Sequence, residues 1–405
     1  MATISNLNNS GEKRIRVLVA PLDWGLGHAT RCIPIIKQLI ALNCEVLIAS
    51  SGGQKALLEQ EFPALRSLEL PGYGLKYGEK RWSTSLKIFL QIPKILTAIK
   101  RENCWLQAFL VRERLDMLIS DNRYGLHSEG LFSIFITHQL CIQTPWGQTI
   151  FGKIAEKKLQ KIHYRYIDRF SRCWVPDLET APTLAGRLAH PELFPSIATR
   201  YIGILSRFRS EGKAASGEGK EQGRDQGKIE EKAERKTGID ILFLLSGPEP
   251  QRTLLEKRVV RELRSYTGKA VIVRGLPGNG GADLADSAGT PFYSHLPAAE
   301  LKKLIDRSGL VISRAGYSTI MDLAALGKRA VLIPTPGQSE QEYLGDRLAG
   351  MHLFMCIRQN DFSLPDVLAA AGRFPFAGWE TGGEGLLQEE ILGILETVFP
   401  IGPPS

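Results

Sequence analysis

The sequence has 405 residues, of which 43% are hydrophobic and 23% charged, with a formal net charge of +8. This length exceeds one ordinary hydrophobic core and predicts two domains of roughly 150–200 residues each. No uninterrupted apolar run approaches the ~20 residues that span a bilayer, and the polar N-terminus lacks an apolar signal segment, so we expect a cytoplasmic protein. Six single cysteines without a C-x-x-C pair fit a reducing compartment and not a zinc site.

The first half predicts alternating strands and helices. Apolar runs at 15–21 and 45–50 flank a helical stretch from Ala29 to Leu42, which is a βαβ unit and implies a parallel sheet. Three more short apolar runs predict buried strands, at 116–121, 132–138 and 173–176.

A glycine-containing loop, Gly25-Leu26-Gly27-His28, joins the first strand to the first helix. Glycines allow a ligand close to the backbone, and a helix N-terminus offers free N–H groups to an anion. His28 lies where open α/β sheets bind ligands, and its near-neutral pKa suits a general base. The alternative is a structural turn with a helix-capping histidine.

Polar residues also follow two later strands of this half. Asp121 ends the strand at 116–121 and is a rival candidate for the base. The neighbouring polar residues are candidates for contacting an acceptor, or else belong to surface turns: Asn122, Arg123, His138 and Gln139.

A basic stretch with seven-residue spacing precedes these strands, at Lys80, Lys87, Lys94 and Arg101. With apolar residues between them, these side chains indicate either contact with an anionic membrane or a solvated face over a core. Pro93 is expected to break or kink a single helix through the stretch.

The segment 209–237 is rich in Gly, Lys and Glu and nearly free of large apolar residues. It cannot bury enough surface to offset its ordering entropy, so we interpret it as a flexible linker. It would separate a domain at 14–208 from one at 238–398, whose last helix can pack back on the first domain. The alternative is a long surface loop within one domain.

The alternation of strand and helix restarts after this segment. Strands are predicted at 239–246, 270–275, 310–316 and 330–334, with helices at 253–266, 297–308, 318–327 and 339–349. The loop after the first of these strands contains Ser246 and Gly247 and is a possible phosphate cradle, although Gly-Pro turns are common.

The most informative motif spans 313–322. A turn at Gly316 opens a helix on which Ser318, Thr319 and Asp322 share one face. The carboxylate can accept the hydroxyls of a ribose, while hydroxyls and free N–H groups can bind phosphate. The next strand leads into a polar helix start that contains Gln338, Gln341 and Glu342, either for sugar hydroxyls or as an ordinary polar cap.

The glycine-histidine loop, together with S-R-A-G-Y-S-T-I-M-D and P-T-P-G-Q-x-E-Q-E-Y, resembles the GT-B glycosyltransferases. More narrowly, the sequence resembles a bacterial branch of the group that contains the lipid I N-acetylglucosaminyltransferase and the diacylglycerol glycosyltransferases. The resemblance covers roughly residues 14–350 without the 209–237 segment. It implies two Rossmann-like α/β domains with the active site in the cleft between them.

The resemblance also implies roles for individual residues. Asp322 takes the place of the family's ribose-binding glutamate, and Gln341 and Glu342 take that of its sugar-contacting glutamine pair. The remaining residues implied to bind the donor are Gly25, Gly27, Ser246, Gly247, Arg274, Ser313, Arg314, Gly316, Ser318, Thr319 and Gln338. GT-B enzymes need no bound metal or other cofactor, and helix N-termini with Arg274 and Arg314 would stabilise the leaving diphosphate.

These features predict an inverting glycosyltransferase that uses a nucleoside diphosphate sugar, with UDP as the expected nucleotide, and a hydroxyl acceptor such as a lipid-linked or cell-envelope glycan. Peripheral contact with the inner face of the membrane is expected, and nucleic acid is not. G-x-G-H-x-x-R, from Gly25 to Arg31, also resembles UDP-sugar hydrolases. A hydrolase or epimerase on the same scaffold, and a non-catalytic sensor of nucleotide sugars, therefore remain alternatives.

Overall fold

The structure is a computed structural model that describes residues 14–74, 91–143, 149–209, 238–278, 284–285, 289–379 and 382–400. The predicted linker at 209–237 lies outside the described residues except for Arg209, as do Lys80 and Lys87 of the basic stretch. None of the described helices combines the length and the apolar character that crossing a bilayer requires.

The first domain is built on a seven-stranded sheet in which every pairing is parallel. The strand order is β3-β2-β1-β4-β5-β6-β7. The strands are β1 (Arg16–Pro21), β2 (Glu45–Ser50), β3 (Arg66–Glu69), β4 (Met117–Asp121), β5 (Phe132–Ile136), β6 (Arg172–Val175) and β7 (Ala198–Tyr201). The helices of this part are α1 (Gly27–Ala41), α2 (Gly52–Glu61), α4 (Ile92–Arg112) and α5 (Ile150–Ile167).

Burial on both faces explains why the central strands of this sheet are short, largely apolar runs, unlike the partly exposed edge strands β3 and β7. Successive side chains of β1 point to opposite faces of the sheet. Val17 and Val19 belong to one hydrophobic cluster, whereas Leu18 and Ala20 belong to another on the opposite face. Helices cover both faces, as a parallel sheet requires.

The second domain repeats this architecture in a sheet of order β10-β11-β9-β8-β12-β13-β14. Its strands are β8 (Ile239–Leu244), β9 (Ala270–Val273), β10 (Leu284–Ala285), β11 (Pro291–Tyr293), β12 (Ser308–Arg314), β13 (Ala330–Ile333) and β14 (Met355–Cys356). All described pairings except β10 with β11 are parallel. Its helices are α7 (Gln251–Leu263), α8 (Ala298–Arg307), α9 (Tyr317–Ala325), α10 (Ser339–Gly350) and α11 (Leu364–Arg373). The predicted fold class, two Rossmann-like domains, is confirmed.

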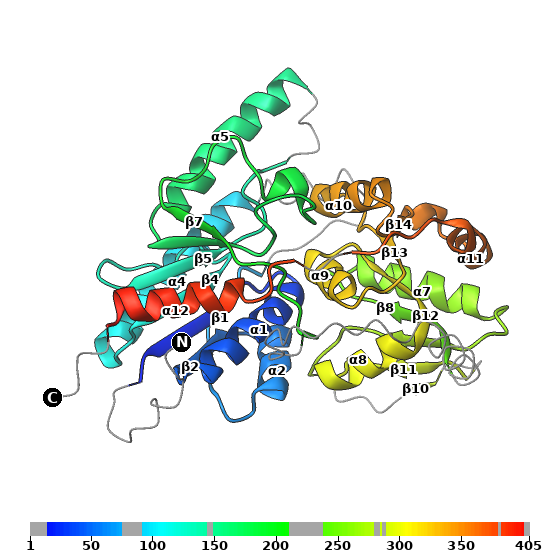
Figure 1. The fold of residues 1–405 in the computed structure, drawn as a ribbon, viewed down its shortest axis with the longest axis horizontal. Coiled ribbons are helices and arrows are strands. Elements are labelled where there is room, and N and C mark those ends of the chain that lie inside the picture. The colour runs from blue at the N-terminus through cyan, green and yellow to red at the C-terminus, as the bar shows by residue number, and fades with distance from the viewer. Residues whose placement is uncertain are drawn as a thin grey trace, which may run out of the picture.

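The last helix, α12 (Leu386–Val398), lies on the first domain, as Figure 1 shows in red. Its Ile391 and Ile394 are fully buried. Its Glu390 accepts hydrogen bonds from Arg172 (2.7 Å) and Trp174 (3.0 Å) of β6. The end of the chain therefore ties the two domains together.

Helix α4 begins at Ile92, so Pro93 stands at the start of a helix and does not interrupt one. It lies in the first turn of α4, where its missing N–H costs no hydrogen bond, and Lys94 and Arg101 lie on the same helix. Ile99 and Leu106 of α4 are buried while Leu96 is 42% exposed, so the helix covers a core with one side.

Each sheet has one point at which its strand order reverses. The order reverses between β1 and β4 in the first sheet, and between β8 and β12 in the second, where open α/β sheets bind ligands. Helices α1 and α9 follow β1 and β12 at these points and contact each other across the domain boundary (Figure 1).

Candidate active site

The N-termini of α1 and α9 meet at the boundary between the two domains, which we call the domain seam. Ser318 of α9 donates a 2.6 Å hydrogen bond to the carbonyl oxygen of Gly27. Tyr317 donates from its hydroxyl to the carbonyl oxygen of Pro176 (2.8 Å). Both side chains are almost completely buried. The two glycine turns that the sequence marked as ligand-binding therefore face each other and are in direct contact.

His28 and Asp121, the two candidates for the base, are hydrogen-bonded to each other. Their Nδ1 and Oδ1 atoms are 2.9 Å apart. The parallel register explains the pairing, because β1 places Pro21 opposite Asp121 of β4 and His28 lies one loop beyond Pro21. Asp121 is completely buried, whereas the side chain of His28 remains 13% exposed.

Arg31, one helical turn after His28, holds the Asp121 carboxylate from the other side. Its Nε is 2.5 Å from Oδ2, and its Nη2 bonds Oδ1. Burial opposes the ionisation of Asp121, but the charges of Arg31 and His28 outweigh it and lower the pKa of Asp121 to about 2. Asp121 is therefore a permanent carboxylate at neutral pH.

These contacts define the state of the His28 ring. Nδ1 of His28 lies near both the Asp121 oxygen and Nη2 of Arg31 (2.8 Å). We assign the proton to Nδ1, because the ionised Asp121 carboxylate can only accept a hydrogen bond; Nη2 of Arg31 then donates to Asp121 and not to the ring. Burial lowers the pKa of His28, so the ring is neutral near pH 7. Its Nε2 forms no hydrogen bond within the described part of the chain and can accept a proton.

His138, expected at the acceptor side, bridges the two domains instead. Its ring stacks on Tyr317 of α9, with centroids 4.2 Å apart and planes at 8°. Its Nδ1 lies 3.0 Å from Nη1 of Arg31, and its Nε2 lies 2.7 Å from Oε1 of Glu340 in α10.

Asp322 lies on the seam side of α9 and is already bonded by the segment that leaves β7. Ser206 donates to it from its hydroxyl (2.9 Å), and Arg207 donates from its backbone N (3.2 Å) and its Nε (3.0 Å). Burial raises the pKa of Asp322, although Arg207 opposes this. In this conformation Ser206 and Arg207 bind the Asp322 carboxylate, which was expected to bind ribose.

Three arginines that were expected to contact ligands are bonded within the protein in this conformation. Arg123 is fully buried, with its Nε 2.7 Å from Glu102, because α4 packs over the end of β4. The guanidinium of Arg314 is buried and donates to backbone carbonyls, most closely that of Gln251 (2.6 Å). Arg274 is paired with Glu256 (2.8 Å). Arg123 and Arg274 are thus paired with glutamates, whereas the charge of Arg314 meets only backbone carbonyls and its Nε has no partner among the described residues.

The loop between β13 and α10 is held by residues expected to contact the sugar. Gln341 accepts from the backbone N of Thr335 (2.9 Å), and Glu342 accepts from that of Gly337 (3.2 Å). The backbone N of Gln338 donates to the Thr335 carbonyl. The hydroxyl of Thr335 is fully buried and has no hydrogen-bond partner among the described residues. The sequence did not single out Thr335.

The remaining donor-side residues surround this loop and the seam. Gly247 has φ +109°, which only glycine adopts readily, and a Cβ there would lie 3.8 Å from the Thr335 hydroxyl. Glu249 forms an ion pair with Arg252, with Oε1 2.7 Å from Nε. Gly25 has φ +78° and Ser313 is buried. Asn122, Gln139 and Gly316 are half-buried in the loops that follow their strands, and Thr319 is half-buried in the first turn of α9.

Arg31, Ser206, Arg207 and Glu340 are site residues to which the sequence had assigned no role. The spacing of His28 and Arg31 on one helix face was a usable signal. Ser206 and Arg207 gave none, because their position depends on how the chain crosses between the domains.

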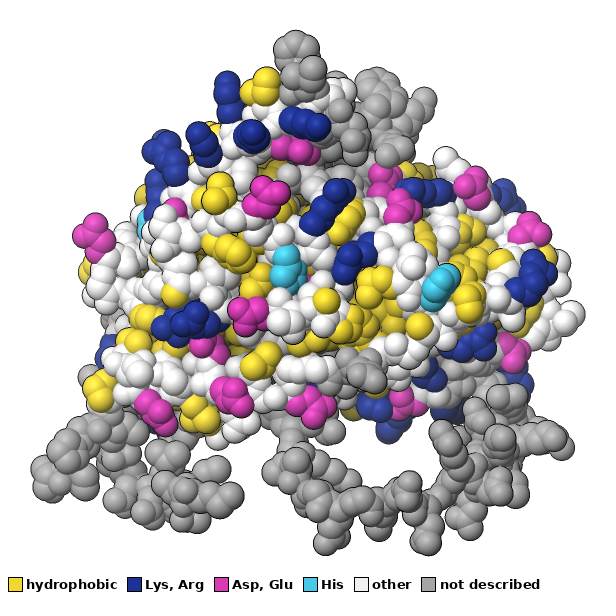
Figure 2. Space-filling model, turned by 45° about the horizontal axis from the view of Figure 1, so that its top comes forward, with side chains coloured by type: hydrophobic (Ala, Val, Ile, Leu, Met, Phe, Trp, Pro, Cys, Tyr) yellow, Lys and Arg dark blue, Asp and Glu magenta, His cyan; other side chains and the backbone are white. Residues whose placement is uncertain are grey.

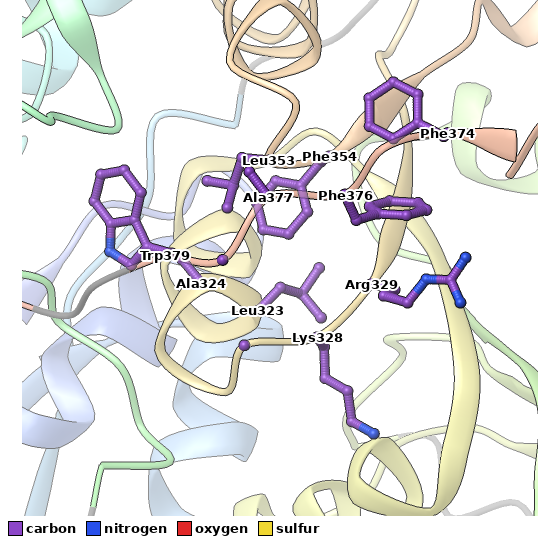
Figure 3. Close-up of a pocket in the computed structure, with 12 residues that line it drawn as sticks. Leu323, Ala324, Lys328, Arg329, Leu353, Phe354, Phe374, Phe376, Ala377 and Trp379 are labelled. Atoms are coloured by element: carbon purple, nitrogen blue, oxygen red, sulfur yellow. The ribbon is translucent and has the colours of Figure 1, made fainter.

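A cavity of about 370 Å³ lies elsewhere, at the C-terminal end of α9 (Figure 3). Leu323, Phe354, Phe376 and Trp379 are among its lining residues, and Lys328 and Arg329 stand at one side. It is at the opposite end of α9 from the seam and is not part of the candidate site.

Residues 290–373 match the glycosyltransferase family 28 C-terminal domain. Two similar relatives are UDP-N-acetylglucosamine--N-acetylmuramyl-(pentapeptide) pyrophosphoryl-undecaprenol N-acetylglucosamine transferases. The one from Methylobacterium radiotolerans is 37% identical over 89 residues, 22% of each chain. The one from Rhodopseudomonas palustris is 37% identical over 75 residues, 18% of this chain and 19% of the relative. The match thus spans about a fifth of the length of these relatives.

Solved structures resemble the whole chain. The spinosyn rhamnosyltransferase SpnG has a TM-score of 0.57 at 17% identity, covering 95% of this chain and all of that one. The glycosyltransferase SnogD from Streptomyces nogalater has a TM-score of 0.50 at 15% identity, covering 94% of both chains. At these identities the likeness establishes the fold, which is that of GT-B glycosyltransferases, and the resemblance predicted from the sequence is confirmed to that extent.

Proposed function

We propose that this protein is an inverting glycosyltransferase that moves a sugar from a nucleoside diphosphate to a hydroxyl acceptor. The observation that carries the proposal is the His28–Asp121 pair, which lies at the ligand-binding edge of the first sheet and faces the N-terminus of α9. A neutral imidazole oriented by a buried carboxylate is a general base of the kind that activates hydroxyl groups.

The two former rivals for the base receive separate roles. Nε2 of His28 takes the proton of the acceptor hydroxyl, and the acceptor oxygen forms a bond to the anomeric carbon. The bond from that carbon to the phosphate oxygen breaks, and the diphosphate leaves with the electron pair. Asp121 orients the ring and stabilises the imidazolium, because its low pKa makes it too weak a base for a hydroxyl.

The donor side is proposed to lie at the N-terminus of α9. Free N–H groups there, with Ser318, Thr319 and the unpartnered hydroxyl of Thr335, suit the oxygens of a diphosphate. Two observations on similar proteins support a nucleotide donor: the names of the partial relatives specify UDP-N-acetylglucosamine, and SpnG has been solved with thymidine diphosphate. We propose UDP, without a bound metal.

Donor binding requires the seam to open. Ser318 now contacts Gly27, and Asp322 is occupied by Ser206 and Arg207. We propose that the domains separate to admit the nucleotide sugar, that the ribose replaces Ser206 and Arg207 at Asp322, and that reclosure excludes water from the reacting centre.

The acceptor is proposed to be lipid-linked or part of the cell envelope, with the protein at the inner face of the membrane. Helix α5 supports membrane contact, because its exposed residues combine positive charge with apolar side chains. They include Lys153, Lys157, Lys158, Lys161 and Arg165, with Ile154 and Ile162 each 49% exposed. Figure 2 shows dark blue side chains gathered over the upper left of the molecule, where α5 lies.

The test measures release of UDP from a panel of UDP-sugars, with and without lipid-linked acceptors. We expect acceptor-dependent release that His28→Ala reduces by at least about 100-fold, while UDP binding by calorimetry is retained. Rapid stoichiometric release without acceptor would instead identify a hydrolase. Tight UDP binding with no turnover on any acceptor would contradict the proposal and favour a sensor.

A further inference from the structure

We propose that Glu340 is a positioning residue that completes the general base only when the domains are closed. This inference rests on the proposed function. It assigns to the second domain a direct part in activating the acceptor hydroxyl, in addition to holding the donor.

A continuous hydrogen-bonded chain joins Glu340 to the candidate base. Oε1 of Glu340 is 2.7 Å from Nε2 of His138, whose Nδ1 is 3.0 Å from Nη1 of Arg31. Arg31 in turn holds Asp121, and Asp121 holds His28 (2.9 Å). Glu340 is the member of this chain that comes from the second domain, so domain opening breaks it at this point.

The directions of these hydrogen bonds give Glu340 a specific task. Arg31 can only donate, so Nδ1 of His138 must accept and its proton must reside on Nε2. That proton needs an acceptor, and the Glu340 carboxylate provides it. Without Glu340 the other tautomer of His138 becomes available, which would point an N–H group at Arg31 and displace the guanidinium that holds Asp121.

Charge gives Glu340 a second effect on the base. The ionisable groups around His28 are Asp121, Arg31, His138 and Glu340. When His28 receives the acceptor proton, the cations His28 and Arg31 are balanced by two carboxylates. Without Glu340 the same cluster carries a net charge of +1, which disfavours the imidazolium.

Contacts around Glu340 depend on closure as well. Ser339 donates to the carbonyl oxygen of Gln143 in the first domain (3.2 Å), and Tyr317 stacks on His138. The first turn of α10 therefore reaches His138 only when the seam is closed. Activation of the acceptor would then await closure over the donor, which limits wasteful hydrolysis.

The experiment compares Glu340→Gln and Glu340→Ala with Asp346→Asn. The control changes a carboxylate on the same helix that is 60% exposed and paired with Arg358. Gln keeps an acceptor for His138 but removes the charge, so we expect the acidic limb of kcat to move to lower pH by about 0.5–1 unit. We expect Ala to lower kcat by about 10-fold or more with a change in donor KM of less than about threefold, and Asp346→Asn to match the parent protein.

A second measurement is independent of turnover. The protein contains seven histidines, so ¹⁵N-histidine NMR with His28→Ala for assignment can follow the titration of His28 directly. A lower pKa of His28 in Glu340→Gln supports the link even if no acceptor is found. An unchanged His28 titration and an unchanged kcat profile in both Glu340 variants would overturn it, whereas loss of activity in His28→Ala alone would leave the proposed function standing.

Discussion

Asp121→Asn tests the buried cluster most directly, because it removes one charge and preserves the shape of the side chain. Asp121 is completely buried and is the closest carboxylate to Arg31, which is itself buried. Removing one partner of such a pair leaves an uncompensated buried charge and costs about 3–5 kcal/mol. The lowered pKa of Asp121, about 2 against an ordinary 3.8, corresponds independently to about 2.5 kcal/mol of stabilisation of the folded carboxylate.

The first assay is urea unfolding at pH 7, with Asp306→Asn as control because that carboxylate is 46% exposed and paired with Lys302. We expect Asp121→Asn to lower the free energy of unfolding of the first domain by about 3 kcal/mol or more, and the control to change it by less than about 0.5 kcal/mol.

The second assay measures kcat of the Asp121→Asn protein that remains folded. An asparagine can donate from its N–H₂ group to Nδ1 of His28, which would move the ring proton to Nε2. Because Nε2 could then no longer accept a proton from the acceptor hydroxyl, we expect kcat to fall about 10³-fold or more. A variant with normal stability would refute the role of Asp121 as the counter-ion of Arg31. A stable variant with normal kcat would refute the proposed base.

Three further outcomes follow from the same structure. Burial lowers the pKa of His163 to about 4, so the unfolded state binds more protons between pH 6.5 and 4. Stability should fall by roughly 1.4 kcal/mol per pH unit from this group as the pH drops through that window, and a flat pH dependence in urea titrations would count against it. Ser206→Ala should strengthen UDP binding a few-fold by calorimetry because it loosens Asp322, whereas Asp322→Ala should weaken it about 10-fold; equal affinities would exclude Asp322 from the nucleotide site. Glu102→Gln should destabilise the first domain by about 3 kcal/mol because Arg123 is fully buried against it, and a change below about 1 kcal/mol in thermal unfolding would contradict this.

The central strands were predictable because each is a short, largely apolar run between turn residues, whereas the edge strands β3 (RSLE) and β7 (ATRY) are partly exposed and were not predicted. The runs at 15–21, 45–50 and 239–246 were predicted within one or two residues of β1, β2 and β8. Buried parallel strands need apolar side chains on both faces, and this requirement is visible in a few consecutive residues of the sequence. The same locality explains why Gly316 was recognised as a turn that opens a helix.

The roles of polar side chains were harder to predict, because a polar residue at a strand end can point either way. Arg123 follows β4 just as Asn122 does, yet its side chain points into the domain because it forms an ion pair with the buried Glu102 of α4. Arg314 ends β12 but is drawn to the carbonyl of Gln251. Sequence spacing placed both residues at the correct edge of a sheet but could not predict which way their side chains point.

The sequence by itself determined two α/β domains, the two glycine turns and the candidacy of His28, Asp121 and Asp322, because strand burial and helix starts are local properties. Only the tertiary structure decided that His28 and Asp121 form a pair, that Ser206 and Arg207 occupy Asp322, and that Glu340 reaches His138 across the seam. These contacts join residues about 90 to 200 positions apart. Their geometry depends on strand register and domain closure, which no local pattern encodes.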